Sequence, residues 1–119
     1  MRPMKYLDRP HILARIIEAK QKRLEVSRIR VPEVVVMKMA STAKAAPSFR
    51  EALMTPQRVR IIAEVKKASP SRGLLKADLD AEQLAAAYTE AGACAISAVT
   101  EEDFFQGDLG WITKIRQAS

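Results

Sequence analysis

Two apolar segments separated by a helical segment constrain the fold of this chain more strongly than any other feature. Residues 59–65 and residues 93–99 are nearly continuous apolar runs, which is typical of strands buried on both faces. Their first residues are about 34 positions apart, as a right-handed strand–helix–strand unit requires. The sequence therefore predicts an α/β fold with two parallel strands. Such strands have open edges, so the pattern also requires further strands beyond these two.

Helix signals accompany the two strands. Asp80 is a predicted N-cap with Gln83 at the third helical position, and Gly92 is predicted to end that helix. A last helix is predicted to open at Asp108. In the first of these helices Leu84, Ala85, Ala87 and Tyr88 are expected to lie on one side, and the last helix is expected to run through Leu109, Ile112 and Ile115.

The segment before the first strand is predicted to be helical. Apolar residues recur at three-, four- and seven-residue intervals over residues 6–30, with Asp8 as N-cap and Pro10 in the first turn. Residues 33–46 are ambiguous: three consecutive valines favour a strand, whereas Met and Ala favour a helix, and we prefer the helix.

A short helix is predicted next. Ser48 and Glu51 form a capping box, and the helix is expected to run through Leu53 and to stop before Pro56.

Basic residues are concentrated in the first half of the chain. Residues 1–60 carry 14 Lys and Arg against 5 Asp and Glu, a net charge of +9, whereas residues 61–119 carry 6 against 9, a net charge of −3. A basic half can bind nucleic acid or another anion. We favour a solvated helical face, because the cations follow helical periodicity without interleaved aromatic residues.

Single cysteine and histidine residues exclude several classes of protein. With only Cys94 and His11, the chain has no disulfide framework, no cysteine-based zinc site and no multi-histidine metal site, and a serine triad is disfavoured. Cys94 is expected to pack in its strand and His11 to lie on the surface. No apolar run approaches the ~20 residues of a membrane span, and charges interrupt the first residues, so we expect a cytoplasmic protein without a signal peptide.

A glutamate and a lysine stand two positions apart at the end of the first strand. Because side chains alternate along a strand, Ile62, Glu64 and Lys66 are predicted to share one face. Polar loop residues 66–78 follow, at the carboxyl end where α/β proteins place their sites. An ion pair that merely ends the strand is the alternative. We favour a functional pair, because desolvating two charges is costly and exposed pairs add little stability.

Three segments of the second half match one family pattern. They are IIAEVKKASPSRG at 61–73, AGA at 91–93 and ISAVTEEDFFQG at 96–107. The chain resembles the indole-3-glycerol phosphate synthase family of tryptophan biosynthesis, whose signatures AE[IV]K..SPS.G and [IL]S.LTE...F.G stand at this spacing. The match covers residues 55–119, and the basic helices before it are similar to the N-terminal extension of the family.

The resemblance implies a (β/α)₈ TIM barrel, a fold that usually needs about 250 residues. On this interpretation residues 1–57 are the basic helical extension, and residues 58–119 are the first two βα units of an incomplete barrel.

The resemblance also implies an activity. The family closes the pyrrole ring of 1-(2-carboxyphenylamino)-1-deoxyribulose 5-phosphate and removes carbon dioxide and water, without a metal or an organic cofactor. By position, Lys66 corresponds to a lysine that contacts the substrate, and Glu64 to its glutamate partner. The predicted substrate-binding residues are Ser69, Pro70, Ser97, Val99 and Phe105, with Val99 where the family usually has Leu.

Simpler interpretations of these residues stay open. Ser97 could satisfy a hydrogen bond in the core, and Phe104 or Phe105 could be packing between loop and helix. Residues 100–102 could cap the last helix.

The family's main acid, its main base and most of its phosphate site lie on later strands and loops, so we expect the 119-residue chain alone to be inactive. Expected partners are the phosphorylated substrate and either a second copy or a complementing C-terminal part. A membrane partner is not expected. A non-catalytic anion or nucleic-acid binding module is the alternative function. A different phosphate-handling barrel is disfavoured by the SPS and TEEDFFQG strings.

Overall fold

A computed structural model describes residues 11–54 and 59–119 of the chain. The chain divides into two compact units, residues 1–45 and residues 46–119. The boundary expected after residue 57 lies within residues 55–58, outside the described ranges, and stays a prediction.

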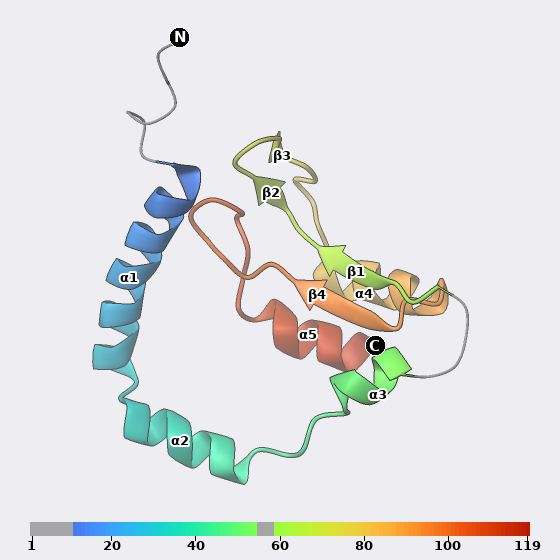
Figure 1. The fold of residues 1–119 in the computed structure, drawn as a ribbon, viewed down its shortest axis with the longest axis horizontal. Coiled ribbons are helices and arrows are strands. Elements are labelled where there is room, and N and C mark those ends of the chain that lie inside the picture. The colour runs from blue at the N-terminus through green and yellow to red at the C-terminus, as the bar shows by residue number, and fades with distance from the viewer. Residues whose placement is uncertain (1–10, 55–58) are drawn as a thin grey trace, which may run out of the picture. The chain divides into compact units, whose positions relative to one another are not determined.

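Over its described residues, the first unit contains two helices, α1 (Ile12–Arg30) and α2 (Glu33–Thr42) (Figure 1). His11 caps α1, because its Nδ1 accepts a hydrogen bond of 3.3 Å from the N–H of Leu13. The predicted cap Asp8 and first-turn Pro10 lie outside the described residues. The ambiguous segment is helical as preferred, although the helix ends at Thr42 rather than at residue 46.

The basic face of α1 is solvated, as the charge pattern indicates. Lys22 Nζ donates to Glu18 Oε1 at 2.8 Å across one helical turn, and both side chains are exposed. The hydrogen bond and the charge of the partner lower the pKa of Glu18 and raise that of Lys22. No helix among the described residues is long and apolar enough to cross a bilayer.

The second unit begins with the short helix α3 (Phe49–Met54). Ser48 Oγ accepts a hydrogen bond of 3.1 Å from the N–H of Glu51, which confirms the predicted cap.

The central part of the second unit is a parallel strand–helix–strand unit followed by a helix. Its elements are β1 (Ile62–Val65), α4 (Ala81–Glu90), β4 (Ala95–Ala98) and α5 (Trp111–Ala118). β1 and β4 are paired in parallel, and α4 and α5 pack against this sheet and against each other (Figure 1). The predicted α/β order and strand direction are confirmed, and both strands are shorter than predicted.

The predicted polar loop after β1 contains a small antiparallel hairpin. Its strands are β2 (Ala68–Ser69) and β3 (Gly73–Leu74). Gly73 has φ of +66°, a left-handed conformation that glycine adopts without steric cost. Two-residue strands carry too little periodicity to be recognised in the sequence, so the prediction of a polar loop over residues 66–78 missed this hairpin.

Helix α4 begins and ends where the sequence predicts. Asp80 Oδ1 accepts a hydrogen bond of 3.0 Å from the N–H of Gln83, and Gly92 follows the helix with φ of +94°. Ala85 is buried, whereas Ala87 is exposed, which corrects the predicted apolar side. The buried stripe passes instead through Ala81 and Ala85, with Leu84 and Tyr88 half-buried beside it.

Helix α5 begins at Trp111, three residues later than predicted. Asp108 Oδ1 accepts from the N–H of Gly110 at 2.7 Å, so this carboxylate stabilises the turn before the helix. Leu109, which the prediction placed in the helix, lies in that turn instead and is 68% exposed.

The core of the second unit lies between the sheet and the two helices. Its buried members are Val65, Ala81, Ala85, Trp111 and Ile115. The prediction that β1 is buried on both faces was wrong for this chain, because Ile62 is 49% exposed. Helices cover the face that carries Val65, whereas Ile62 and Glu64 lie on the other face of a sheet that has only two strands in the described residues.

We predict that Asp80→Ala lowers the free energy of unfolding by about 1 kcal/mol, because the first turn of α4 loses its side-chain acceptor. Urea titration followed by far-UV circular dichroism measures the change. Asp78→Ala, which removes an exposed carboxylate two residues earlier, is the matched control and should change stability by less than about 0.5 kcal/mol. Equal losses in the two variants would contradict the cap.

Candidate active site

Glu64, Lys66 and Ser97 form a linked polar group at the carboxyl end of the sheet. Lys66 Nζ lies 2.8 Å from Glu64 Oε1, and Ser97 Oγ donates a long hydrogen bond of 3.5 Å to Glu64 Oε2. The side chains of Lys66 and Glu64 are 34% and 45% exposed. An ion pair this exposed contributes little to stability. Its arrangement is therefore better explained by contacts with a bound molecule than by a stabilising role.

Strand register places these three residues together. In the parallel pairing of β1 with β4, Glu64 lies opposite Ser97 and Val65 lies opposite Ala98. Paired residues point to the same face of a sheet, so Ser97 shares the face of Glu64 while Val65 and Ala98 face the helices. The predicted proximity of Glu64 and Lys66 is confirmed, and the catalytic roles assigned to them stay predictions.

Ser69 and Pro70 lie on the hairpin that follows β1. Ser69 Oγ accepts a hydrogen bond of 3.2 Å from the N–H of Arg72 and lies 3.4 Å from Ser71 Oγ. These contacts stabilise the tight turn between β2 and β3, and Pro70 is exposed on that turn. Their substrate-binding roles stay predictions.

Val99 and Phe105 follow β4. The N–H of Val99 donates to the carbonyl of Val65 at 3.0 Å, which continues the pairing of the two strands. The carbonyl of Phe105 accepts from the N–H of Ala68 at 3.1 Å, so the loop after β4 is bonded to the hairpin after β1. Phe105 is half-buried. The structure therefore joins the two loops that carry the predicted binding residues.

Sequence reasoning missed the structural role of Glu101. Its carboxylate accepts hydrogen bonds from the N–H groups of Asp103, Phe104 and Phe105, at 3.0, 2.7 and 3.1 Å. The suggestion that residues 100–102 cap the last helix was wrong for Glu101, because this carboxylate caps the turn inside its own loop. A carboxylate two to four residues before consecutive N–H groups is the signal that could have indicated this.

The Glu64–Lys66 arrangement can hold and polarise an oxygen atom. An ammonium group has three donors, and the bond to Glu64 uses one of them. Lys66 can therefore also donate to a ketone oxygen or a carboxylate at the open face of the sheet. Glu64 keeps the ammonium oriented and can accept a proton from a neighbouring group.

In the part of the chain that the structure describes, no group of three His, Cys, Asp or Glu residues could hold a metal ion. Cys94, the residue immediately before β4 in the sequence, is half-buried, and its Sγ donates to the carbonyl of Ile61 at 3.2 Å.

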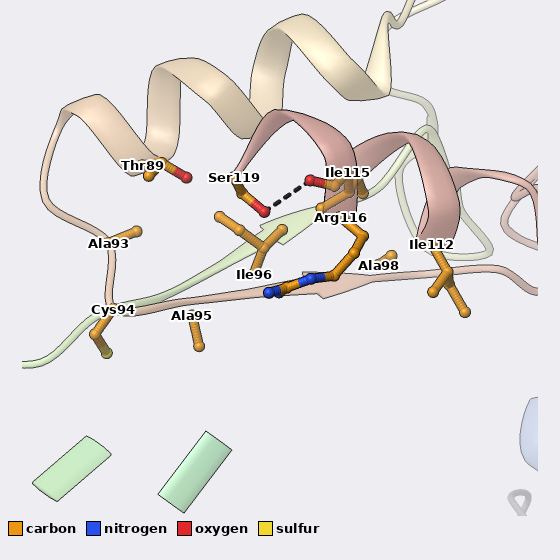
Figure 2. A pocket seen from close by; sticks show the side chains of 10 residues that line it. All are labelled: Thr89, Ala93, Cys94, Ala95, Ile96, Ala98, Ile112, Ile115, Arg116 and Ser119. Atoms are coloured by element: carbon orange, nitrogen blue, oxygen red, sulfur yellow. Dashed lines mark hydrogen bonds between the residues drawn. The ribbon is translucent and has the colours of Figure 1, made fainter. Parts of the chain in front are cut away.

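A pocket of about 490 Å³ lies away from the charged pair, beside β4 and α5 (Figure 2). Its lining includes Ile96 and Ala98, which point to the helix side of β4, together with Ile112, Ile115 and Arg116 of α5, so the pocket lies between β4 and α5. On the helix side, the side chain of Arg116 extends from α5 toward β4, and Ser119 Oγ donates to the carbonyl of Ile115 at 2.7 Å.

The parallel pairing, the crossover helix and the charged pair at the carboxyl ends of the strands define an α/β protein with the site position typical of α/β enzymes. The family model described as indole-3-glycerol phosphate synthase matches residues 13–119. The chain belongs to this family.

Individual relatives agree with the family match, and each is named indole-3-glycerol phosphate synthase. The relative from Desulfotalea psychrophila is 40% identical over 109 residues, covering 90% of this chain and 41% of the relative. The relative from Halalkalibacterium halodurans is 43% identical over 98 residues, covering 82% of this chain and 35% of the relative. The chain thus spans about two fifths of the length of these relatives. These matches give no support to the nucleic-acid alternative.

Proposed function

We propose that this chain provides the first two βα units of an indole-3-glycerol phosphate synthase with a (β/α)₈ barrel. The observation that carries the proposal is the Glu64–Lys66 pair, joined to Ser97 at the carboxyl ends of two parallel strands, in a chain of this family. The reaction is ring closure of 1-(2-carboxyphenylamino)-1-deoxyribulose 5-phosphate with loss of carbon dioxide and water. The enzyme is a carbon–carbon carboxy-lyase, which we place in the cytoplasm.

In this proposal Lys66 donates to an oxygen of the substrate while the ring closes, and so stabilises the negative charge that develops there. Glu64 holds the ammonium in position through the 2.8 Å contact. Ser97, on the same face of the sheet, orients the glutamate.

Loop residues would complete the binding site on this chain. Ser69, Pro70 and Phe105 lie on the two loops that the Ala68–Phe105 hydrogen bond joins, and they would flank the anthranilate ring. Val99 would add an apolar wall beside Ser97, because alternate residues face the same side.

We also propose that a C-terminal part completes the site by pairing with the edge of β4. The pocket beside β4 is lined mostly by apolar side chains, together with Thr89, Arg116 and Ser119, and the relatives are more than twice as long as the matched region. A parallel strand added there would continue the sheet, as strands do at unprotected edges. The acid, the base and the phosphate site expected from later strands would come with it.

Mixing the chain with a separately expressed C-terminal part tests this proposal. We would use the portion of the Halalkalibacterium halodurans relative that follows its matched region, and measure formation of indole-3-glycerol phosphate by its indole fluorescence. We expect no turnover by either piece alone, and turnover by the mixture together with co-elution in size-exclusion chromatography.

A single-chain fusion of the two pieces controls for weak association. A fusion that folds cooperatively but makes no product would overturn the proposed function. Turnover by the isolated 119-residue chain, purified from a host that lacks the enzyme, would overturn the requirement for a C-terminal part.

A further inference from the structure

The loop between β4 and α5 is organised around one side chain. Glu101 Oε1 accepts from the N–H of Asp103, and Oε2 accepts from the N–H groups of Phe104 and Phe105, at distances of 2.7 to 3.1 Å. The backbone carbonyl of Glu101 accepts from the N–H of Gly107 at 2.7 Å. The side chain of Glu101 therefore closes the middle of the loop, and its main-chain carbonyl closes the end of the loop.

Steric contacts fix the same loop at its far end. A Cβ atom at Gly107 would clash with the carbonyl oxygen of Val99, so no other residue fits without a backbone shift. Gln106 has φ of +51°, a left-handed conformation that is uncommon for residues other than glycine. Such a conformation persists where surrounding contacts determine it. The bonds to Glu101 on one side and the close approach of Gly107 on the other provide those contacts.

The loop in turn holds the segment after β1. The carbonyl of Phe105 accepts from the N–H of Ala68, which is 3% exposed and begins the hairpin that carries Ser69 and Pro70. A shift of Phe105 would therefore move or release the hairpin. Glu101, which does not belong to the predicted site residues, reaches both predicted binding loops through this one residue.

We propose that Glu101 is a positioning residue for substrate binding, which acts through Phe105. Its carboxylate holds the Phe105 backbone, so the aromatic side chain and the Ala68 contact keep the geometry that binds the substrate ring. This inference rests on the proposed function, since it assumes that Phe105 faces the substrate. It assigns to Glu101 no proton transfer and no contact with the reacting atoms.

Kinetics of the single-chain fusion test the role in binding. In Glu101→Gln an amide NH₂ replaces one oxygen and faces N–H donors, so at least one charge-assisted bond is lost. We expect KM to rise about tenfold to a hundredfold while kcat changes less than about threefold. The pH profile of kcat should stay unchanged. Glu101→Asp keeps the charge and a carboxylate within reach of the nearer N–H groups, and should recover most of the loss.

Two controls separate positioning from general destabilisation. Glu102→Gln removes the same charge from the next, exposed residue and should leave KM within about twofold of the parent. In a double-mutant cycle with Phe105→Leu, the effects of Glu101→Gln and Phe105→Leu on KM should be strongly non-additive, because both act on the same contact. Additive effects, an equal rise in KM for Glu102→Gln, or a loss confined to kcat would overturn the proposal.

Amide hydrogen exchange in the 119-residue chain gives a second readout that does not depend on activity. The N–H groups of Phe104 and Phe105 should exchange at least about tenfold faster in Glu101→Gln, whereas the amides of α4 should not change. Unchanged exchange at Phe104 and Phe105 would overturn the role of Glu101. A parent fusion without turnover would instead overturn the proposed function, and exchange would still decide whether Glu101 holds the loop.

Discussion

Replacing Lys66 with Met is expected to lower kcat/KM of the reconstituted enzyme by about a hundredfold to ten-thousandfold, the range for loss of a positioned acid or charged donor. Methionine keeps an unbranched side chain of similar length, so the packing of the stem is preserved while the ammonium is removed. The 2.8 Å contact with Glu64 disappears with it. Steady-state kinetics of the single-chain fusion, with product measured by indole fluorescence, give the value.

The matched control for this prediction is Lys67→Met. It removes the same charge from the next residue, whose carbonyl accepts from Leu75 and whose ammonium has no assigned role in the reaction. We expect kcat/KM within about threefold of the parent. Because the Glu64–Lys66 pair is substantially exposed, Lys66→Met should change the free energy of unfolding by less than about 1 kcal/mol. A stable Lys66→Met enzyme with parental kcat/KM would show that the pair only ends the strand.

The Glu64–Lys66 pair was predictable from the sequence because it depends on a local rule. Residues two apart in a strand share a face, and this holds whatever the rest of the chain does. Its proximity to Ser97 needed only the parallel direction of β1 and β4, which the intervening helix imposes. The starts of α4 and α3 were predictable for the same reason, since Asp80 and Ser48 each cap through bonds to residues three positions later.

Features that depend on backbone donors in loops were not predictable in this way. For residues 100–102 the sequence left open a cap for the last helix, a common place for a carboxylate. In the structure the loop folds back on Glu101, and helix α5 starts only at Trp111. The hairpin β2–β3 was missed similarly, since its register is set by the turn around Ser69 and by the Phe105 carbonyl, a contact 37 positions away in the sequence.

The burial of Trp111 depends on packing and could not be predicted from the sequence either. The last helix was predicted to open at Asp108 and to run through Leu109, Ile112 and Ile115. Placing the helix start at Trp111 leaves Leu109 68% exposed and brings Trp111 to 8% exposure, in contact with the cluster that contains Val65 and Ile115. The sheet and α4 determine that Trp111, and not Leu109, is buried. The sequence of the last helix alone does not contain this information.

Trp111→Ala should therefore destabilise the second unit more than any other single substitution discussed for this chain, by about 3–5 kcal/mol. The indole is the largest side chain in a core whose other buried members include two alanines, so little neighbouring volume can collapse into the cavity. Domains are stable by only about 5–15 kcal/mol, and a core this small places the chain at the lower end. Urea unfolding followed by far-UV circular dichroism measures the loss, since the variant has no tryptophan left for fluorescence.

Two further variants make this result specific to the core. Leu109→Ala removes an exposed apolar side chain two residues earlier, and should change the free energy of unfolding by less than about 0.5 kcal/mol. Trp111→Phe keeps an aromatic ring in the same cluster and should lose less than Trp111→Ala. If Trp111→Ala and Leu109→Ala unfold at the same urea concentration, the contact between α4, α5 and the sheet is not what stabilises the unit. The loops carrying Phe105 and Ser69 would then have no rigid support, because both are connected to the sheet through residues adjoining this core.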